Sequence, residues 1–211
     1  MVANEAEMNG IVGQLVAAIG KDYVLTGDAD REFYAMDVYT TRELPIAVVQ
    51  PGSVEDMVTI ARLADEFDVA LVARGGGASY TDAYLQDTAR SLTVDTSRMN
   101  RILELNEIDM YVTVEPGISW SEMTAALNER GLRTPFWGPF SGLKATVGGS
   151  ASQNAVSLGS GTHGISADSI LSFEIVMPGG KTLKTGSAAM STASPFFRWY
   201  GPDLTGLFTG D

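Results

Sequence analysis

The stretch Val72-Ala-Arg-Gly-Gly-Gly-Ala-Ser-Tyr80 places three consecutive glycines at the end of an apolar run, residues 69–73. The run is typical of a buried strand. Glycine lacks a Cβ, so the loop can adopt positive φ and admit another group close to its backbone. Successive backbone N–H groups there form an anion-binding concavity, and Arg74 adds a permanent cation. The pattern predicts a pyrophosphate cradle. For three glycines alone, a tight surface turn is the alternative.

A second glycine-rich stretch, Ala145-Thr-Val-Gly-Gly-Ser-Ala-Ser-Gln-Asn-Ala155, favours the cradle. Around the first stretch the pattern is that of a parallel crossover unit: a strand at 46–50, a Pro51-Gly52 turn, a helix at 54–67 and the strand at 69–73. Ser53 with Asp56 resembles a capping box for this helix. Residues 4–19 predict an amphipathic helix that ends at Gly20. Residues 21–43 are polar and predict an irregular link.

Beyond the loop, the pattern alternates strands with one helix. Strands are predicted at 91–95, 101–105, 110–115, 170–177 and 181–185, with hairpins joining the second to the third and the fourth to the fifth. Ser119 and Glu122 form a capping box for a helix at 120–130, which Gly131 ends. The segment 201–211 resembles the start of a helix. We therefore expect an α+β fold with a lead-in at 1–44, a first subdomain at 45–84 and a second at 85–211. The polar segment 81–90 would join the two subdomains.

Composition excludes several classes of function. The chain has 211 residues, 45% hydrophobic and 19% charged, which suits a globular protein with a sizeable core. A formal net charge of −12 argues against nucleic-acid binding, which needs clustered Lys and Arg. With no Cys and one His, His163, we expect no metal site. No apolar run is long enough to span a bilayer, and we expect a cytoplasmic protein.

Six motifs in order resemble the FAD-binding domain of the vanillyl-alcohol oxidase or p-cresol methylhydroxylase (PCMH-type) flavoproteins. Within that superfamily they are most similar to the D-lactate and glycolate dehydrogenase branch. The motifs span residues 45–56 (PIAVVQPGSVED), 73–79 (ARGGGAS), 113–118 (TVEPGI), 145–149 (ATVGG), 173–180 (FEIVMPGG) and 201–208 (GPDLTGLF). The resemblance covers the chain from Pro45 onward. It implies a fold of two α+β subdomains with FAD held between them.

The resemblance also implies cofactor-binding roles for individual positions, and it identifies no catalytic residue. Backbone groups of the first loop would wrap the pyrophosphate. Arg74 could pair with phosphate oxygens, or its side chain could point away and tie the loop to an acidic neighbour. Other positions would pass close to the cofactor or line its flavin and ribityl side, and the last three would approach its other end. In chain order, the implied cofactor-binding residues are Arg74, Gly75, Gly76, Gly77, Ala78, Ser79, Pro116, Gly117, Gly138, Ser141, Thr146, Gly148, Gly149, Ser152, Gly164, Ile175 and Val176. For Gly148 and Gly149, tight helix packing is the alternative; Ile175 and Val176 are expected in the core, with only their backbones near FAD.

By resemblance, the activity would be oxidation of a small 2-hydroxy acid or related alcohol by hydride transfer to flavin N5. Phe136, Trp137 and Phe140 would line the substrate pocket. The family's substrate domain follows its FAD domain, so we expect a missing C-terminal domain or partner chain. Residues 1–211 alone would then have negligible dehydrogenase activity. The chain departs from the family at residues 80–84 and 155–158, where bulkier residues stand near the expected flavin edge.

Three further points concern the attachment of FAD, the catalytic competence of the chain and the type of cofactor. The family often attaches FAD through a His in the first loop, but residues 74–84 contain none, so we expect noncovalent FAD. An FAD-binding module of a larger assembly, with no catalysis of its own, is the second interpretation of the chain. A Rossmann NAD enzyme is a third, weaker one, because the loop lacks the Gly-x-Gly-x-x-Gly spacing and no long helix follows it.

Overall fold

The structure is a computed structural model that describes residues 5–135, 141–190 and 201–210. The chain forms two compact units. The first comprises Met1–Met99 and Val176–Lys181, and the second comprises Asn100–Ile175 and Thr182–Asp211. The expected boundary at 84/85 differs from this division. It would separate the strand at 91–95 from the sheet to which that strand is hydrogen-bonded.

A four-stranded sheet forms the centre of the first unit, in the order β1 (Val24–Leu25), β2 (Ala47–Val49), β4 (Ser91–Asp95) and β3 (Ala70–Arg74). β2 and β3 both run parallel to β4, whereas β1 is antiparallel to β2. β4 therefore lies between β2 and β3 in the sheet. In a simple β-α-β unit the two strands joined by the crossover would be adjacent. All five residues of β4 are buried. β3 was expected to be buried but is an edge strand whose Leu71 is exposed.

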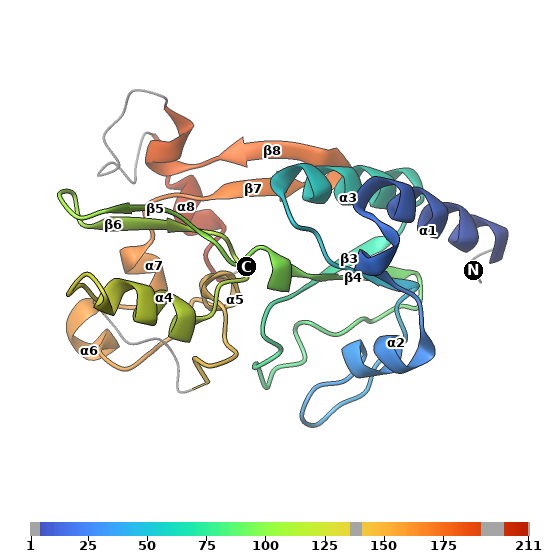
Figure 1. The fold of residues 1–211 in the computed structure, drawn as a ribbon, viewed down its shortest axis with the longest axis horizontal. Coiled ribbons are helices and arrows are strands. Elements are labelled where there is room, and N and C mark those ends of the chain that lie inside the picture. Colours follow the sequence, from blue (N-terminus) through green and yellow to red (C-terminus); the bar gives the residue numbers. More distant parts are fainter. Residues whose placement is uncertain (1–4, 136–140, 191–200, 211) are drawn as a thin grey trace. The chain divides into compact units, whose positions relative to one another are not determined.

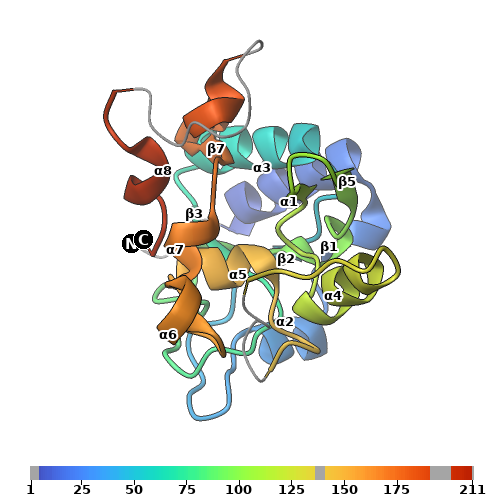
Figure 2. The ribbon, with the colours of Figure 1, turned by 90° about the vertical axis from the view of Figure 1, so that its left-hand side faces the viewer.

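Two helices pack against each other on one side of this sheet, and a third lies on the other side. Figures 1 and 2 show α1 (Glu5–Ile19) and α3 (Val54–Glu66) on one side and α2 (Asp28–Tyr34) opposite. The helical spacing of apolar residues in α1 and α3 buries one face of each. The core of the unit consists of Ile11, Leu15, Ile19, Val24, Ala47, Val49, Ile60, Leu63, Val69, Leu92 and Val94.

The link at 21–43 is more regular than the sequence predicts. It contains a 3₁₀ turn, η1 (Lys21–Tyr23), then β1 and α2. None of the residues of α2 is buried, so the helix has no apolar stripe for a sequence pattern to detect. Polar contacts hold it instead: Arg31 Nε donates to Pro45 O at 2.6 Å, and Tyr34 Oη donates to Asp95 Oδ2 at 2.5 Å.

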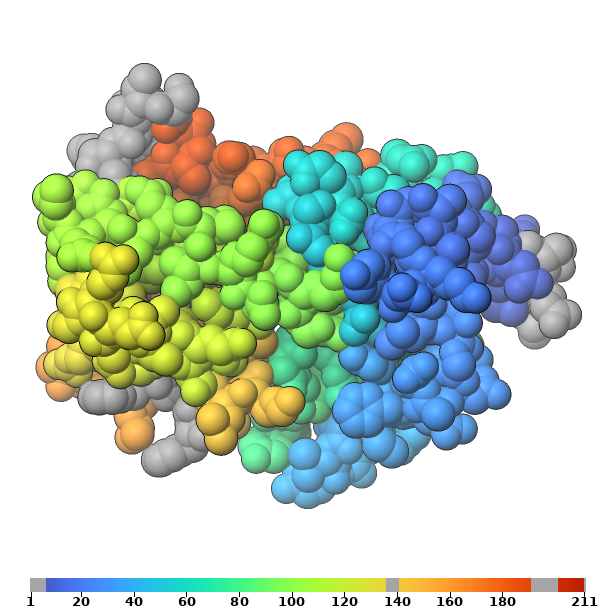
Figure 3. Space-filling view, in the orientation of Figure 1, coloured from blue at the N-terminus to red at the C-terminus, as the bar shows by residue number. Residues whose placement is uncertain are grey.

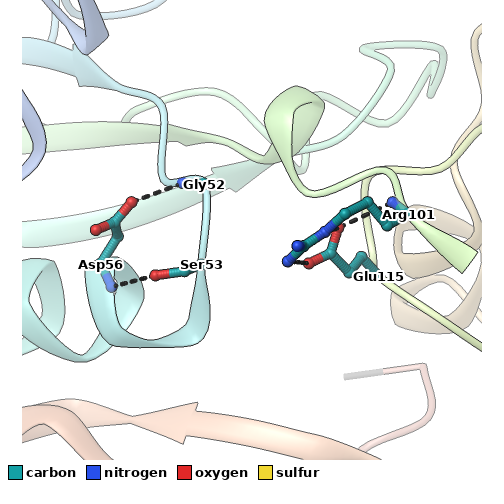
Figure 4. A network of polar contacts seen from close by, with 5 residues as sticks. All are labelled: Gly52, Ser53, Asp56, Arg101 and Glu115. Atoms are coloured by element: carbon teal, nitrogen blue, oxygen red, sulfur yellow. Dashed lines mark hydrogen bonds and ion pairs between the residues drawn. The ribbon is translucent and has the colours of Figure 1, made fainter. Parts of the chain in front are cut away.

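Both predicted N-caps are present. Ser53 Oγ accepts from the N–H of Asp56 at 3.1 Å, but the Asp56 carboxylate accepts from Gly52 N–H rather than returning to Ser53 (Figure 4). Ser119 and Glu122 form the full reciprocal box at the start of α4 (Trp120–Asn128), which ends two residues earlier than predicted. A side-chain acceptor at each helix start satisfies a backbone N–H that has no partner within the helix.

The second unit is built from small elements around one cluster. The predicted hairpin is β5 (Ile102–Asn106) and β6 (Tyr111–Val114). Its strands pack with α4 around the buried Ile118, Trp120, Met123 and Leu127. Short helices follow: α5 (Val147–Ser152), α6 (Ser160–His163), α7 (Ser166–Ser169) and α8 (Leu204–Leu207). A 3₁₀ turn, η4, spans Gly186–Ala189.

The hairpin of β7 (Glu174–Met177) and β8 (Lys181–Lys184) is confirmed, although β7 begins later than the predicted residue 170. The turn residues Pro178–Gly180 (η3) belong to the first unit, where a Cβ on Gly180 would lie 2.7 Å from Val58 O of α3. A further 3₁₀ turn, η2 (Thr96–Arg98), follows β4. Within the described ranges, no helix is long and apolar enough to cross a membrane.

Candidate cofactor site

The glycine loop leaves β3 at Arg74 and turns at Gly77, whose φ of +62° favours glycine. Within the described part of the chain, the backbone N–H groups of Gly75, Gly76, Gly77 and Ala78 have no hydrogen-bond acceptor. All four residues are only half-buried. Backbone donors normally find a partner, so four successive ones without an acceptor are suited to holding an anionic group.

The side chain of Arg74 is buried beside this loop and makes no ion pair among the described residues. Its Nη1 donates to Tyr34 O at 3.1 Å and to Met36 O at 3.2 Å. The guanidinium carbon lies 4.6 Å from the ring centre of Tyr84, 5.1 Å from that of Tyr34 and 5.5 Å from that of Phe33. A Cβ on Gly77 would lie 2.8 Å from Arg74 Nη2. We call Arg74, Phe33, Tyr34 and Tyr84 the Arg74 cluster.

Tyr84 fixes the loop from the same buried region. Its hydroxyl donates to Gly77 O at 2.9 Å and to Ser79 O at 3.3 Å. Burial raises the pKa of the Tyr84 hydroxyl, so it remains a donor at neutral pH. From the sequence, residues 80–84 were interpreted as added bulk near the flavin edge. The structure instead gives Tyr84 a supporting role in the loop.

Asp95, at the end of the neighbouring strand β4, gathers three donors. Tyr34 Oη and Gln50 Nε2 donate to its Oδ2, the latter at 2.8 Å, and Ser97 N–H donates to its Oδ1 at 2.9 Å. Burial, followed by the hydrogen bond to Asp95, raises the pKa of Tyr34 far above its usual range. Tyr34, Tyr84 and Asp95 were not identified as site residues from the sequence. Tyr34 and Asp95 meet across 61 residues, and the hydroxyl of Tyr84 bonds loop carbonyls that no side-chain pattern marks.

The loop after α2 is tied to the segment that follows the glycine loop. Arg42 forms an ion pair with Asp82 at 2.6 Å, and the rings of Tyr39 and Tyr80 lie 6.1 Å apart. Figure 3 shows the segment after α2, in blue, at the surface. Two N–H groups, those of Tyr39 and Thr40, donate to the Asp37 carboxylate and lower its pKa. An exposed ion pair such as Arg42–Asp82 contributes little to stability.

The second glycine-rich segment differs from the first, because its donors are used internally. Val147 N–H donates to Ile118 O at 2.9 Å, Gly148 N–H to Pro116 O at 2.9 Å, and Gly149 N–H to Thr146 Oγ1 at 3.1 Å. A Cβ on Gly148 would lie 2.6 Å from Pro116 Cβ. Close packing of backbones accounts for Gly148, and this is the alternative that the sequence left open.

An ion pair holds the start of the Pro116-Gly117 segment in place. The Arg101 guanidinium donates to both carboxylate oxygens of Glu115, at 2.6 and 3.1 Å, and Arg101 N–H adds a third bond at 2.9 Å (Figure 4). The hydrogen bond with Arg101 lowers the pKa of Glu115. Pro116 itself is exposed and Gly117 is buried.

The remaining candidates lie in different surroundings. Ser141 is half-buried, and Ser152 is exposed with its hydroxyl donating to Gly148 O. Gly164 has φ of +84°, and a Cβ there would collide with the carboxylate of Asp168. Ile175 and Val176 are half-buried and lie outside both core clusters, contrary to expectation. Gly138, like Phe136, Trp137 and Phe140, lies outside the described residues.

The described residues contain no group of His, Asp and Glu able to hold a metal ion. His163 is exposed at the end of α6. The chemistry that this set of residues offers is therefore backbone hydrogen bonding to an anion on a supported loop, together with glycines that permit close approach.

Comparison with known proteins agrees with this chemistry. A family model described as an FAD binding domain matches residues 45–186. An uncharacterized FAD-linked oxidoreductase of Mycobacterium tuberculosis is 28% identical over 206 residues, which are 96% of this chain and 43% of that protein. The mitochondrial D-lactate dehydrogenase (cytochrome) of Arabidopsis thaliana is 32% identical over 88% of this chain and 32% of its own length.

Among solved structures, p-cresol methylhydroxylase with substrate bound superposes with a TM-score of 0.82 at 22% identity, over 99% of this chain and 41% of that chain. This likeness confirms the expected PCMH-type α+β fold. The chain thus spans less than half the length of each of these three proteins.

Proposed function

This chain belongs to the FAD binding domain family, and on that premise we propose that it carries FAD for an oxidoreductase acting on a small 2-hydroxy acid or related alcohol. The substrate class is proposed from the 32% identity to a D-lactate dehydrogenase. When bound, FAD would supply a flavin that accepts hydride at N5, and the protein would orient it and exclude competing reactions.

One observation carries the proposal: the four loop N–H groups from Gly75 to Ala78 that have no acceptor within the described residues. A pyrophosphate has several anionic oxygens, each able to accept from a backbone N–H. The positive φ of Gly77 and the hydrogen bond from Tyr84 to its carbonyl support the loop in this shape. We expect Gly75, Gly76, Gly77, Ala78 and Ser79 to hold the pyrophosphate.

The second segment would contribute differently. Since the N–H groups of Val147, Gly148 and Gly149 already donate within the chain, we propose that this segment meets FAD by close van der Waals approach and through hydroxyl groups. Ser141 and Ser152 are the hydroxyls in question. Pro116 and Gly117, held by the neighbouring Glu115–Arg101 pair, would pass close to the cofactor.

The direct test is to purify the chain, record its absorption spectrum, and titrate it with FAD and with NAD by fluorescence. We expect flavin bands or FAD uptake, and no NAD binding. Absence of both flavin bands and FAD uptake on refolding would reject the proposal, and selective NAD binding would favour a Rossmann-type cofactor instead.

A second measurement separates an enzyme from an FAD-binding module with no catalysis of its own. The FAD-loaded protein is assayed with D-lactate, glycolate and a panel of alcohols, using an artificial dye as electron acceptor. Turnover identifies an enzyme and its substrate class together. FAD binding without turnover of any member of the panel is the outcome expected of residues 1–211 alone, and it would describe this chain as an FAD-binding module.

A further inference from the structure

We propose that Arg74 and Tyr84 are positioning residues: they hold the glycine loop from its buried side, and Arg74 acts through its planar shape rather than by pairing with a phosphate. The inference rests on the proposed FAD function for its main readout. It differs from both roles that the sequence left open for Arg74, which were pairing with phosphate oxygens and an ion pair with an acidic neighbour.

The first step is the environment of the guanidinium. Arg74 is 7% exposed, and its Nη1 is occupied by the carbonyls of Tyr34 and Met36. On its other side, Nη2 and Nε lie against Gly77, where a Cβ would come within 2.8 and 3.0 Å of them. The group therefore fills the space behind the loop, where a side chain at residue 77 would otherwise lie.

The second step concerns shape. Three aromatic rings lie within 4.6 to 5.5 Å of the guanidinium carbon. A planar, weakly hydrated guanidinium stacks on such rings while donating in its own plane. A lysine ammonium has the same charge but is a compact, strongly hydrated point without the fork. Lysine at this position would keep the positive charge and lose the fit.

The third step concerns what is held. Tyr84 stacks under the guanidinium and also donates to Gly77 O and Ser79 O. The two side chains thus fix one glycine by contact and two carbonyls by hydrogen bonds, while Thr96 Oγ1 bonds Arg74 O at 3.4 Å. With its carbonyls held on the inner side, the loop presents N–H groups in one conformation instead of ordering them on binding, which would cost affinity.

The experiment compares Arg74→Lys, Arg74→Met and Tyr84→Phe with the wild-type chain. For each we measure the FAD dissociation constant at two salt concentrations, the midpoint of thermal unfolding, and the rate of chymotrypsin cleavage after Tyr80 without FAD. Tyr80 is 67% exposed and lies in the segment that follows the loop, so its cleavage reports on loop order independently of FAD. Tyr84→Phe keeps the ring and removes only the hydroxyl.

Arg98→Lys is the matched control. Arg98 lies in the same unit, stacks on Tyr23 at 3.3 Å and donates to Gln50 O at 2.6 Å, away from the loop. Arg98→Lys therefore loses the same kinds of aromatic and carbonyl contacts as Arg74→Lys. We expect it to lower the unfolding midpoint without changing FAD affinity or cleavage after Tyr80.

We expect Arg74→Lys and Arg74→Met to weaken FAD binding by a similar factor, about tenfold or more, with the salt dependence of binding unchanged. Tyr84→Phe should weaken it by about threefold to tenfold, as expected for one lost hydrogen bond. All three should speed cleavage after Tyr80. Wild-type affinity in Arg74→Lys with a loss in Arg74→Met, or a reduced salt dependence in Arg74→Met, would show direct phosphate pairing and overturn the inference.

Failure of the proposed function would give a different result from failure of the positioning role. If the wild-type chain binds no FAD, the function is wrong, and the positioning role is decided by the cleavage rates alone. Unchanged cleavage after Tyr80 in both Arg74 variants and in Tyr84→Phe would then overturn the inference, whereas faster cleavage in all three would support it.

Discussion

At the scale of single residues, the two glycine-rich segments use glycine for different reasons. In the first, glycines leave backbone N–H groups without an acceptor in the described chain. In the second, Gly148 allows a close approach to Pro116. We therefore expect substitution of a glycine to weaken ligand binding in the first segment and to lower stability in the second.

We predict that Gly76→Val abolishes FAD binding, because a branched Cβ blocks close approach of the pyrophosphate to the loop. The expected loss is roughly 100-fold or more, about 2.8 kcal/mol at 1.4 kcal/mol per tenfold, measured by flavin fluorescence titration. Gly13→Val, where a Cβ meets nothing within 4 Å, is the control and should bind normally. Wild-type affinity in Gly76→Val would mean that the cradle is misplaced.

Gly148→Ala should lower the free energy of unfolding by about 1–3 kcal/mol, the usual cost of inserting a methyl group into packed structure. The added Cβ would meet Pro116 Cβ at 2.6 Å and Pro116 O at 2.8 Å. Urea unfolding measures the change. Gly161→Ala, with open space around its Cβ, is the matched control in the same unit. Equal stability of the two variants would contradict the packing role.

At the scale of elements, polar contacts organise the parts that hydrophobic patterns leave undefined. Helix α2 buries none of its residues, yet Arg31 and Tyr34 tie it to Pro45 and Asp95. The carbonyls of Tyr34, at its end, and of Met36, just beyond it, also accept hydrogen bonds from Arg74. A helix without an apolar stripe thus becomes part of the support for the glycine loop.

The Glu115–Arg101 pair, which flanks the β5–β6 hairpin, predicts a pH dependence. Hydrogen bonding to Arg101 lowers the pKa of Glu115 in the folded chain. A carboxylate with a depressed folded pKa stabilises the fold above its unfolded pKa, about 4.3, and loses this contribution as pH falls through the folded value. As the pH falls below about 5 and Glu115 becomes protonated, we expect the wild type to lose more stability than Glu115→Gln. Parallel losses in thermal unfolding of the two proteins would count against the pair.

At the scale of the whole molecule, the chain has a PCMH-type fold and belongs to the FAD binding domain family. Each of its two units contains its own buried cluster, one around the four-stranded sheet and one around α4. The family assignment covers residues 45–186. The whole lead-in at 1–44, which includes helix α1, precedes that range and nevertheless belongs to the first unit.

We predict that FAD is bound without a covalent bond. The chain has no Cys, its single His is exposed in α6, and residues 74–84 contain no His. Acid precipitation of the FAD-loaded protein should release all the yellow colour into the supernatant, measured by absorbance. Flavin that remains with the washed pellet would establish a covalent link, and mass spectrometry of its peptides would locate it.

The sequence by itself determined the helices α1, α3 and α4, every strand of the described chain except β1, and both hairpins, because each depends on a pattern within one short window: apolar spacing, a capping residue or a glycine turn. The family followed from six motifs in order along the chain. It also predicts a cofactor-binding backbone in the loop that follows β3, and this stays a prediction. Only the tertiary structure decided that β4 lies between β2 and β3, that α2 exists, and that Arg74 faces aromatic rings and carbonyls. These outcomes depend on contacts such as Tyr34 with Asp95 and Arg74 with Met36. Their partners are far apart in sequence, and no local pattern specifies which of them meet when the chain folds.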